Sequence, residues 1–281
     1  MHYILYNTLS GNKKGLESAR LLVGNLAPEN TTLIDVCSIT NYADFWKNVD
    51  IENDTVILSG GDGTLNRFIN ANKEFTLPQN LFYYPSGSGN DFKNDVAKDS
   101  KELIPLHKYI DDLPTVTING KTSYFINGIG YGLDGYCCEV GDQLKSQGKL
   151  PNYTSIAIQG LLFHFKPVNA TVVVDGEKYD FKKVWIAPTM FGRYYGGGMM
   201  PTPEQDRNAA EKTVSLMVFH DTGKLQTLMI FPAIFQGEHV KHAENITILK
   251  GKNITVTFDR PASLQIDGET RLNVTTYTVT M

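Results

Sequence analysis

The stretch that decides the fold is Ser59-Gly60-Gly61-Asp62-Gly63-Thr64, which directly follows Asp54-Thr55-Val56-Ile57-Leu58. The β-branched run predicts a buried strand, and residues 65–70 have the pattern of a first helical turn. A strand, a glycine-rich loop and a helix N-terminus together let backbone N–H groups and the helix dipole face a phosphate. A tight turn without a ligand is the plainer interpretation. Asp62 favours function, because a carboxylate beside phosphates is unfavourable unless it handles a metal ion or a substrate proton.

A second polar loop, Pro85-Ser86-Gly87-Ser88-Gly89-Asn90-Asp91-Phe92, follows the predicted strand 81–84. Ligands of open α/β sheets bind at the carboxyl ends of the strands. Both loops leave such ends, and each carries one aspartate. We therefore expect the two loops to converge on one crevice.

Two later stretches also carry carboxylates. Asn127-Gly128-Ile129-Gly130-Tyr131-Gly132-Leu133-Asp134 reads either as a bulged strand or as the source of a third carboxylate, which with Asp62 and Asp91 could hold Mg²⁺. Asp267-Gly268-Glu269 has a counterpart in Asp175-Gly176-Glu177. Asp-Gly is a favoured hairpin turn, so the pattern alone cannot separate these two copies.

The hydrophobic period changes near Leu113-Pro114. Before it, strand and helix patterns alternate, which predicts a parallel sheet with helices on both faces. The expected strands are 3–6, 31–36, 55–58 and 81–84, and the expected helices are 14–25, 42–49 and 65–71. After it, hairpins and strands predict a mainly antiparallel β-sandwich with one helical insert at 151–165. We assign residues 1–118 to an α/β nucleotide-binding domain and residues 119–281 to a β-sandwich domain for a lipid substrate.

Composition narrows the class of protein. The chain has 281 residues, a formal net charge of −4 and three cysteines without a disulfide or metal-ligand spacing, which predicts a cytoplasmic protein with reduced thiols and no nucleic-acid partner. No apolar run reaches the ~20 residues that a bilayer requires. We interpret His239 and His242 as part of a solvated loop. The sequence leaves open whether the chain forms a homodimer.

Taken together, the motifs resemble those of the bacterial diacylglycerol kinase-like lipid kinases, which are related to sphingosine kinases and more distantly to NAD kinases and phosphofructokinases. Gly60 to Thr64 matches the family's Gly-Gly-Asp-Gly-Thr, and Pro85 to Phe92 matches its Pro-x-Gly-Thr-x-Asn-Asp-Phe with Ser88 for Thr. Further matches are Gly130 to Asp134, a glycine cluster at Gly196 to Met199, and Gln265 to Glu269. The last match favours Asp267 over Asp175.

The resemblance implies an ATP-dependent phosphotransferase that uses Mg²⁺ and acts on a hydroxyl of a membrane lipid such as diacylglycerol, at the inner face of the membrane. It implies catalytic roles for Asp62, which would orient or deprotonate the hydroxyl, and for Glu269 as a rival base. It implies an ATP site lined by Asn7, Ser10, Thr40, Gly60, Gly61, Gly63, Thr64, Ser86, Ser88 and Gly268. Asp91 and Asp134 would belong to a Mg²⁺-linked acidic network.

One departure concerns a structural Mg²⁺ site. The segment 201–210 lacks the Asp-Gly that often follows the proline in relatives. Asp206 could supply the ligand instead, or the site is absent. Two other functions stay open on the sequence: a kinase of a soluble hydroxyl substrate such as NAD, and a nucleotide-binding regulator without turnover.

Overall fold

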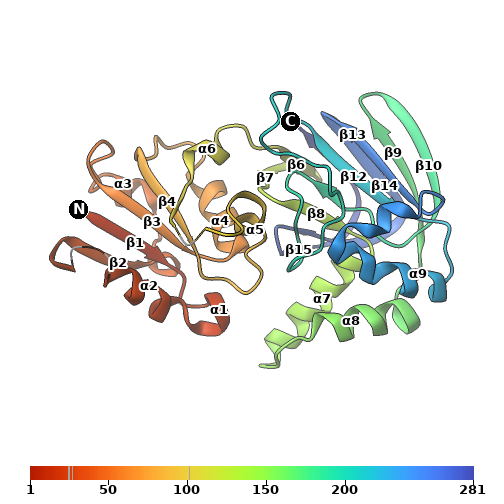
Figure 1. Cartoon of the computed structure of the whole chain (residues 1–281), viewed down its shortest axis with the longest axis horizontal. Coiled ribbons are helices and arrows are strands. Elements are labelled where there is room, and N and C mark those ends of the chain that lie inside the picture. The colour runs from red at the N-terminus through yellow and green to blue at the C-terminus, as the bar shows by residue number, and fades with distance from the viewer. Residues whose placement is uncertain (25, 27, 101) are drawn as a thin grey trace. The chain divides into compact units, whose positions relative to one another are not determined.

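The computed structural model describes residues 1–24, 26, 28–100 and 102–281, and contacts within the chain divide it into two compact units, Met1–Leu113 and Pro114–Met281 (Figure 1). The division precedes the hairpin of β6 (Thr115–Ile118) and β7 (Lys121–Tyr124). This hairpin belongs to the second unit because β6 pairs with the last strand, β15 (Glu269–Thr280).

The first unit is built on a five-stranded sheet with the order β2-β1-β3-β4-β5. Its strands are β1 (His2–Tyr6), β2 (Thr31–Asp35), β3 (Thr55–Gly60), β4 (Asn80–Pro85) and β5 (Ile104–Pro105). The first four pair in parallel, and the short β5 is antiparallel to β4. Loops that leave β1, β3 and β4 therefore start from the same edge of the sheet.

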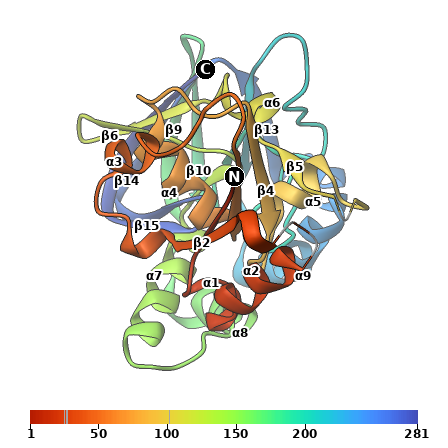
Figure 2. The same ribbon diagram turned by 90° about the vertical axis from the view of Figure 1, so that its left-hand side faces the viewer.

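Helices cover both faces of this sheet, as the alternating pattern predicts. On one face α2 (Gly15–Val23) packs Ala19 and Leu22 against Ile4 and Ile57. Because neighbouring strand residues point to opposite faces, Leu5, Val56 and Leu58 face the other side, where α4 (Asp62–Asn72) lies against β3. Figure 2 shows α2 and α4 on opposite sides of the strands.

The remaining described helical segments of the first unit are shorter than α2 and α4. They are α1 (Ser10–Lys13), η1 (Pro28–Asn30), η2 (Val36–Ser38), α3 (Tyr42–Trp46), α5 (Asp91–Val96) and α6 (His107–Ile110). Rings of α3 pack on Phe68 of α4. The helix expected at 14–25 begins at Gly15 and ends at Val23, and position 25 lies outside the described residues.

Ten strands of the described second unit form one mostly antiparallel sheet. Besides β6, β7 and β15 they are β8 (Gly128–Tyr131), β9 (Val168–Val174), β10 (Glu177–Val184), β11 (Thr189–Met190), β12 (Val214–Phe219), β13 (Ile246–Gly251) and β14 (Asn253–Ile266).

Strand β14 joins two arms of this sheet. Its first half pairs with β9 and its last three residues pair with β8, while the register against β15 shifts between Thr257 and Leu264. The irregularity turns the strand, and β9 comes into contact with β13 of the other arm. The sheet therefore folds back on itself, in agreement with the predicted sandwich architecture.

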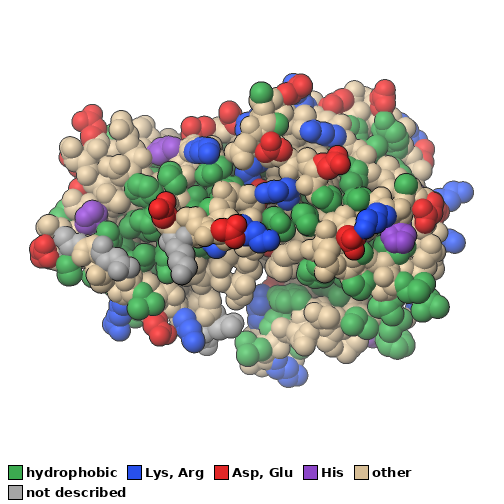
Figure 3. Space-filling view, viewed as in Figure 1, with side chains coloured by type: hydrophobic (Ala, Val, Ile, Leu, Met, Phe, Trp, Pro, Cys, Tyr) green, Lys and Arg blue, Asp and Glu red, His purple; other side chains and the backbone are tan. Residues whose placement is uncertain are grey.

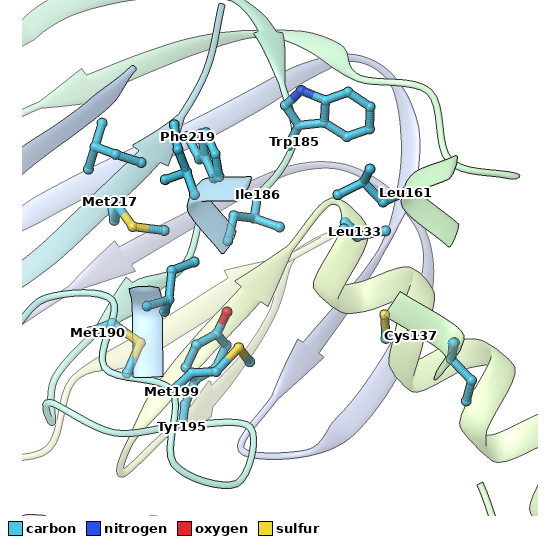
Figure 4. Close-up of a cluster of buried hydrophobic side chains, with 14 residues drawn as sticks. Leu133, Cys137, Leu161, Trp185, Ile186, Met190, Tyr195, Met199, Met217 and Phe219 are labelled. Carbon is cyan, nitrogen blue, oxygen red and sulfur yellow. The ribbon is translucent and has the colours of Figure 1, made fainter. Parts of the chain in front are cut away.

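Helical segments cover part of the second unit and share one hydrophobic core with the sheet. They are α7 (Leu133–Ser146), α8 (Tyr153–Gln159), the π-helical turn η3 (Gly160–His164), α9 (Lys224–Ile230), η4 (Phe231–Gln236) and η5 (Glu238–Lys241). Leu133 and Leu161 meet Trp185, Ile186 and Phe219 in this core (Figure 4). The expectation of a single helical insert at 151–165 is therefore wrong, because α7 and the α9–η5 segment are also helical.

Candidate functional site

The loop after β3 is held tightly against the start of α4. A Cβ on Gly60 would lie 2.5 Å from the Cβ of Thr64, so only glycine fits there. Gly61 caps α4 in extended backbone, without a side-chain cap among the described residues. The first N–H groups of a helix have no partner within the helix, and a helix N-terminus attracts anions. This end of α4 is therefore suited to a phosphate group.

The second polar loop lies directly against the first. A Cβ on Gly87 would come within 2.4 Å of the Gly61 Cα, and a Cβ on Gly61 would lie 3.1 Å from the Gly87 Cα. Asn90 adopts a left-handed conformation (φ 54°), and its side chain bonds both the N–H and the carbonyl of Gly87. The expected convergence of the two loops is thus present within the first unit.

Asp62 ties the two loops together. One oxygen of its carboxylate accepts a hydrogen bond from the Asp91 N–H (3.0 Å), and the other accepts one from the Phe92 N–H (2.8 Å). Asp62 therefore binds the N-terminus of α5, where a negative charge is favourable. Asp91 itself is buried. Burial and the two aspartate charges raise the pKa of Tyr83 well above its ordinary value.

The loop after β1 completes this cluster. The Asn7 amide donates to Thr64 Oγ1 (2.8 Å), and Ser10 Oγ lies 3.2 Å from the same oxygen. Ser86 Oγ is 3.1 Å from Ser59 Oγ. The structure thus links polar residues that the sequence places in three separate loops.

Three other predicted nucleotide-binding positions of the first unit, Gly63, Ser88 and Thr40, also follow strands of the parallel sheet. Gly63 is the second residue of α4. Ser88 is exposed at the tip of the second loop, and Thr40 is exposed beyond η2, which follows β2. All three lie in segments that follow the carboxyl ends of parallel strands.

In the second unit, a strand, a glycine turn and a helix place Asp134. Gly132 takes a left-handed backbone conformation (φ 94°) between β8 and α7. A Cβ on Gly130 would lie 1.3 Å from Asp134 Oδ2, so the carboxylate folds back over the strand where glycine leaves room. Gln265 Nε2 donates to the same oxygen (3.2 Å). Burial raises the pKa of Asp134 to about 6, against the opposing effect of the Gln265 hydrogen bond.

The two Asp-Gly turns differ in burial. Asp267 is 6% exposed, and its carboxylate accepts hydrogen bonds from the N–H groups of Ile126, Asn127 and Gly128. Asp175 is exposed and bonds the N–H groups of residues 252 and 253. Asp267 therefore anchors the buried segment that leads into β8.

Gly268 and Glu269 lie beside this anchor. The Gly268 N–H donates to Gln265 Oε1 (2.6 Å), so one glutamine connects the turn with Asp134. Glu269 is half-buried at the start of β15.

Sequence reasoning missed Arg207. Its guanidinium is buried and donates to the Ile126 carbonyl (2.9 Å) and to Asn127 Oδ1 (3.2 Å). Residues 126–128 are thus bound by two side chains: Asp267 accepts hydrogen bonds from their N–H groups, and Arg207 donates to the Ile126 carbonyl and the Asn127 side chain. No spacing rule indicates such a residue, because Arg207 lies far from Asn127 in sequence.

The predicted metal ligands come from both units, Asp91 from the first and Asp134 and Asp206 from the second. Asp206 is exposed, and one of its oxygens accepts the Asn208 N–H (2.8 Å). Across residues 1–24, 26, 28–100 and 102–281, no cluster of three or more His, Cys, Asp or Glu side chains has the arrangement of a metal site. The interpretation of His239 as solvated is wrong: its ring is fully buried and Nε2 donates to the Pro201 carbonyl (2.9 Å), while His242 is half-buried.

Two sequence families match the chain. The diacylglycerol kinase catalytic domain matches residues 2–115, and the YegS C-terminal NAD kinase beta sandwich-like domain matches residues 127–279. The first match contains both glycine loops, and the second contains Asp134, Arg207 and Asp267.

Individual relatives are distant. A diacylglycerol kinase of Mycobacterium tuberculosis (strain H37Rv) is 23% identical over 72% of this chain, which spans 66% of that relative's length. A candidate lipid kinase of Staphylococcus aureus (strain JH9) is 26% identical over 88% of this chain, which spans 79% of that relative's length. A candidate diacylglycerol kinase from Bacillus anthracis has a similar fold, with a TM-score of 0.68 at 18% identity, over 99% of this chain and 91% of that chain.

Proposed function

This chain belongs to the diacylglycerol kinase-like family of bacterial lipid kinases, and we propose that it transfers the γ-phosphate of ATP to a hydroxyl of a membrane lipid such as diacylglycerol. The observation that carries the proposal is the close contact of Gly61 with Gly87 beside the N-terminus of α4. A side chain on Gly87 would push the two loops apart, so glycine is needed to keep their backbones together beside a helix N-terminus that can bind a phosphate. The match of the catalytic domain over residues 2–115 supports the same assignment.

We assign the nucleotide to the three loops of the first unit. Asn7 and Ser10 would fix Thr64, whose hydroxyl lies in the first turn of α4. Gly60, Gly61 and Gly63 would bring the backbone close to phosphate oxygens. Ser86 and Ser88 would supply hydroxyl groups. Outside these three loops we also propose Thr40, which follows η2, and Gly268 of the second unit as nucleotide contacts.

The donor chemistry fits Mg²⁺. Asp62 and Asp91 offer hard carboxylate oxygens within one unit, and Mg²⁺ is held in proteins by one or two carboxylates together with substrate phosphates and water. When bound, the ion would neutralise charge on the transferred phosphoryl group. We also propose Asp134 for this network. Asp206, which is exposed and engaged with its own turn, is the weakest of the proposed ligands.

We propose that Asp62 orients the acceptor hydroxyl or takes its proton, with Glu269 as the alternative base. Phosphoryl transfer requires in-line positioning more than covalent chemistry. The two backbone hydrogen bonds at α5 hold the Asp62 carboxylate in one orientation. Because a carboxylate offers about four lone-pair positions, these bonds leave acceptor capacity for a hydroxyl.

Asp62→Asn tests this role. The amide keeps the shape of the side chain but removes the basic oxygen, so we expect turnover to fall at least about 100-fold. ATP affinity should stay within a few-fold, since the carboxylate faces the start of α5. Steady-state kinetics and equilibrium ATP binding measure the two effects. Asp175→Asn, which changes an exposed turn, is the matched control and should retain full turnover.

The function itself is tested by transfer of γ-labelled phosphate from ATP and Mg²⁺ to a total bacterial lipid extract, with NAD as acceptor in a parallel tube. Label in an organic-soluble product supports the proposal and identifies the acceptor. Label on NAD would instead establish a soluble-substrate kinase. Nucleotide binding without transfer to either acceptor would contradict the proposal and favour a regulator without turnover.

A further inference from the structure

Four large apolar side chains of the second unit are exposed near one another. Ile158, Phe163, Leu225 and Met229 have exposed fractions of 41%, 74%, 70% and 66%. We refer to these four residues as the apolar patch. Exposed groups of this kind mark interaction sites in soluble proteins.

The patch spans segments that pack together. The π-helical turn η3 contacts α9, and Lys224 Nζ donates to the Leu162 carbonyl across them. Leu225 and Met229 are four residues apart on α9 and therefore share one face of that helix. In Figure 3, hydrophobic side chains gather over the region where Figure 1 shows α8 and α9.

The surroundings of the patch carry only positive charge along the sequence. Residues 143–174 and 222–237 contain no aspartate or glutamate, although the chain as a whole has a net charge of −4. The same two stretches contain Lys149, Lys166 and Lys224, all of them exposed. Along the sequence, the patch therefore has a cationic border, formed by these three lysines, in a chain that is acidic overall.

A pocket of about 450 Å³ begins at His164, the residue after Phe163 of the patch. Its lining includes the basic side chains of His164, Lys166 and Arg260 and one carboxylate, that of Glu139. The Arg260 guanidinium donates to the carbonyls of residues 166 and 167, which keeps it at the pocket. The Glu139 carboxylate accepts a hydrogen bond from Ser263 Oγ, and Lys166 and Arg260 outnumber it, so the lining has a net positive charge that favours an anionic headgroup.

We infer that the apolar patch and its cationic border dock onto the surface of an anionic lipid bilayer. Apolar side chains enter the interface between headgroups and acyl chains, and lysines beside them are attracted by anionic headgroups. This inference rests on the proposed function, because a lipid kinase must reach an acceptor that stays in the membrane. Within the described residues, no helix combines the length and the apolar character that a membrane span requires.

The test compares binding of the full chain to vesicles of phosphatidylcholine alone and of equal parts phosphatidylcholine and phosphatidylglycerol. The wild type should bind the anionic vesicles more tightly, and added salt should weaken that binding. A triple variant, Phe163→Ser, Leu225→Gln and Met229→Gln, should lose at least about tenfold in affinity for anionic vesicles, since it removes most of the inserted apolar area. Lys166→Glu should lower the affinity for anionic vesicles only.

Leu21→Gln is the matched control. Leu21 is 66% exposed on α2 of the first unit, so the same chemical change is made outside the patch, and vesicle binding should not change. Equal binding by the wild type and the triple variant would overturn the inference. So would a wild-type dimer that becomes a monomer in the triple variant without any vesicle binding, because a second copy would then cover the patch.

A second readout separates this inference from the proposed function. Short-chain diacylglycerol dispersed in detergent requires no docking, so the triple variant should phosphorylate it at the wild-type rate while losing turnover on vesicles. Failure of the wild type on dispersed lipid would contradict the kinase proposal but not vesicle docking. Retained vesicle turnover in the triple variant would contradict docking by the patch.

Discussion

Asp267 and Asp175 show how burial gives two copies of one tripeptide different structural roles. Both start Asp-Gly turns with left-handed backbone, at φ 46° and φ 48°. Only Asp267 is buried, with three backbone N–H groups on its carboxylate. Local sequence could not separate them, because burial depends on strands that are distant in sequence.

Asp267→Asn should therefore destabilise the chain much more than Asp175→Asn. An amide has one acceptor oxygen, and its NH₂ group would face backbone donors that need an acceptor. We expect a loss of about 2–4 kcal/mol in the free energy of unfolding for Asp267→Asn and less than about 1 kcal/mol for Asp175→Asn. Urea unfolding measures both, and equal losses would contradict an anchoring role for Asp267.

His239 makes stability depend on pH. Burial lowers its pKa below the ordinary 6.5, and the charge of neighbouring His242 acts in the same direction. The folded chain thus favours the neutral ring. The stability gained from the neutral ring is fully present above pH 6.5 and is lost as the pH falls from 6.5 through the lower pKa of the folded state.

His239→Leu should remove this dependence. Between about pH 7 and about pH 5.5, the wild type should lose about 1 kcal/mol relative to the variant. His164→Gln, at an exposed position, is the control and should follow the wild type. A parallel pH profile for the wild type and His239→Leu would show that the buried ring does not titrate in this range.

At the scale of elements, the glycine loops were predictable and their contact was not. The sequence indicates β3 and the start of α4, and the structure places Gly60 at the end of the strand and Asp62 at the start of the helix. The hydrogen bond between Asp62 and the start of α5 joins residues that are 29 positions apart in sequence. No local sequence pattern predicts such a contact.

Helix α7 shows why one element was missed. It contains Gly135 and Gly141, which lower helix propensity. Both glycines serve close packing: a Cβ on Gly135 would lie 1.8 Å from the Ser263 carbonyl oxygen, and one on Gly141 would lie 2.7 Å from the Tyr153 ring. Tertiary packing therefore stabilises a helix that local sequence propensity does not predict.

Gly87→Ala tests the contact between the two loops. The new Cβ would meet the Gly61 backbone at 2.4 Å, which would force the loops apart, so we expect ATP affinity to fall at least about tenfold, or about 1.4 kcal/mol. Gly24→Ala is the control, because its Cβ would lie at an ordinary van der Waals distance of 3.5 Å from the Leu21 carbonyl oxygen. Unchanged ATP binding by Gly87→Ala would remove the argument for a nucleotide at these loops.

At the scale of the molecule, the change of hydrophobic period near Leu113 indicated where one architecture gives way to another. The two matched families cover residues 2–115 and 127–279, and the compact units meet at Leu113 and Pro114. The fold class was therefore predictable. The nature of the acceptor lipid was not, because many lipids share one hydroxyl and an apolar tail.

The most direct test of the central claim is phosphate transfer from labelled ATP to purified diacylglycerol in mixed micelles, with the wild type and Asp62→Asn compared side by side. We predict labelled phosphatidic acid from the wild type and almost none from Asp62→Asn, with ATP bound by both. Absence of a labelled lipid with the wild type, for diacylglycerol and for every lipid of a bacterial extract, would contradict the assignment of this chain as a lipid kinase.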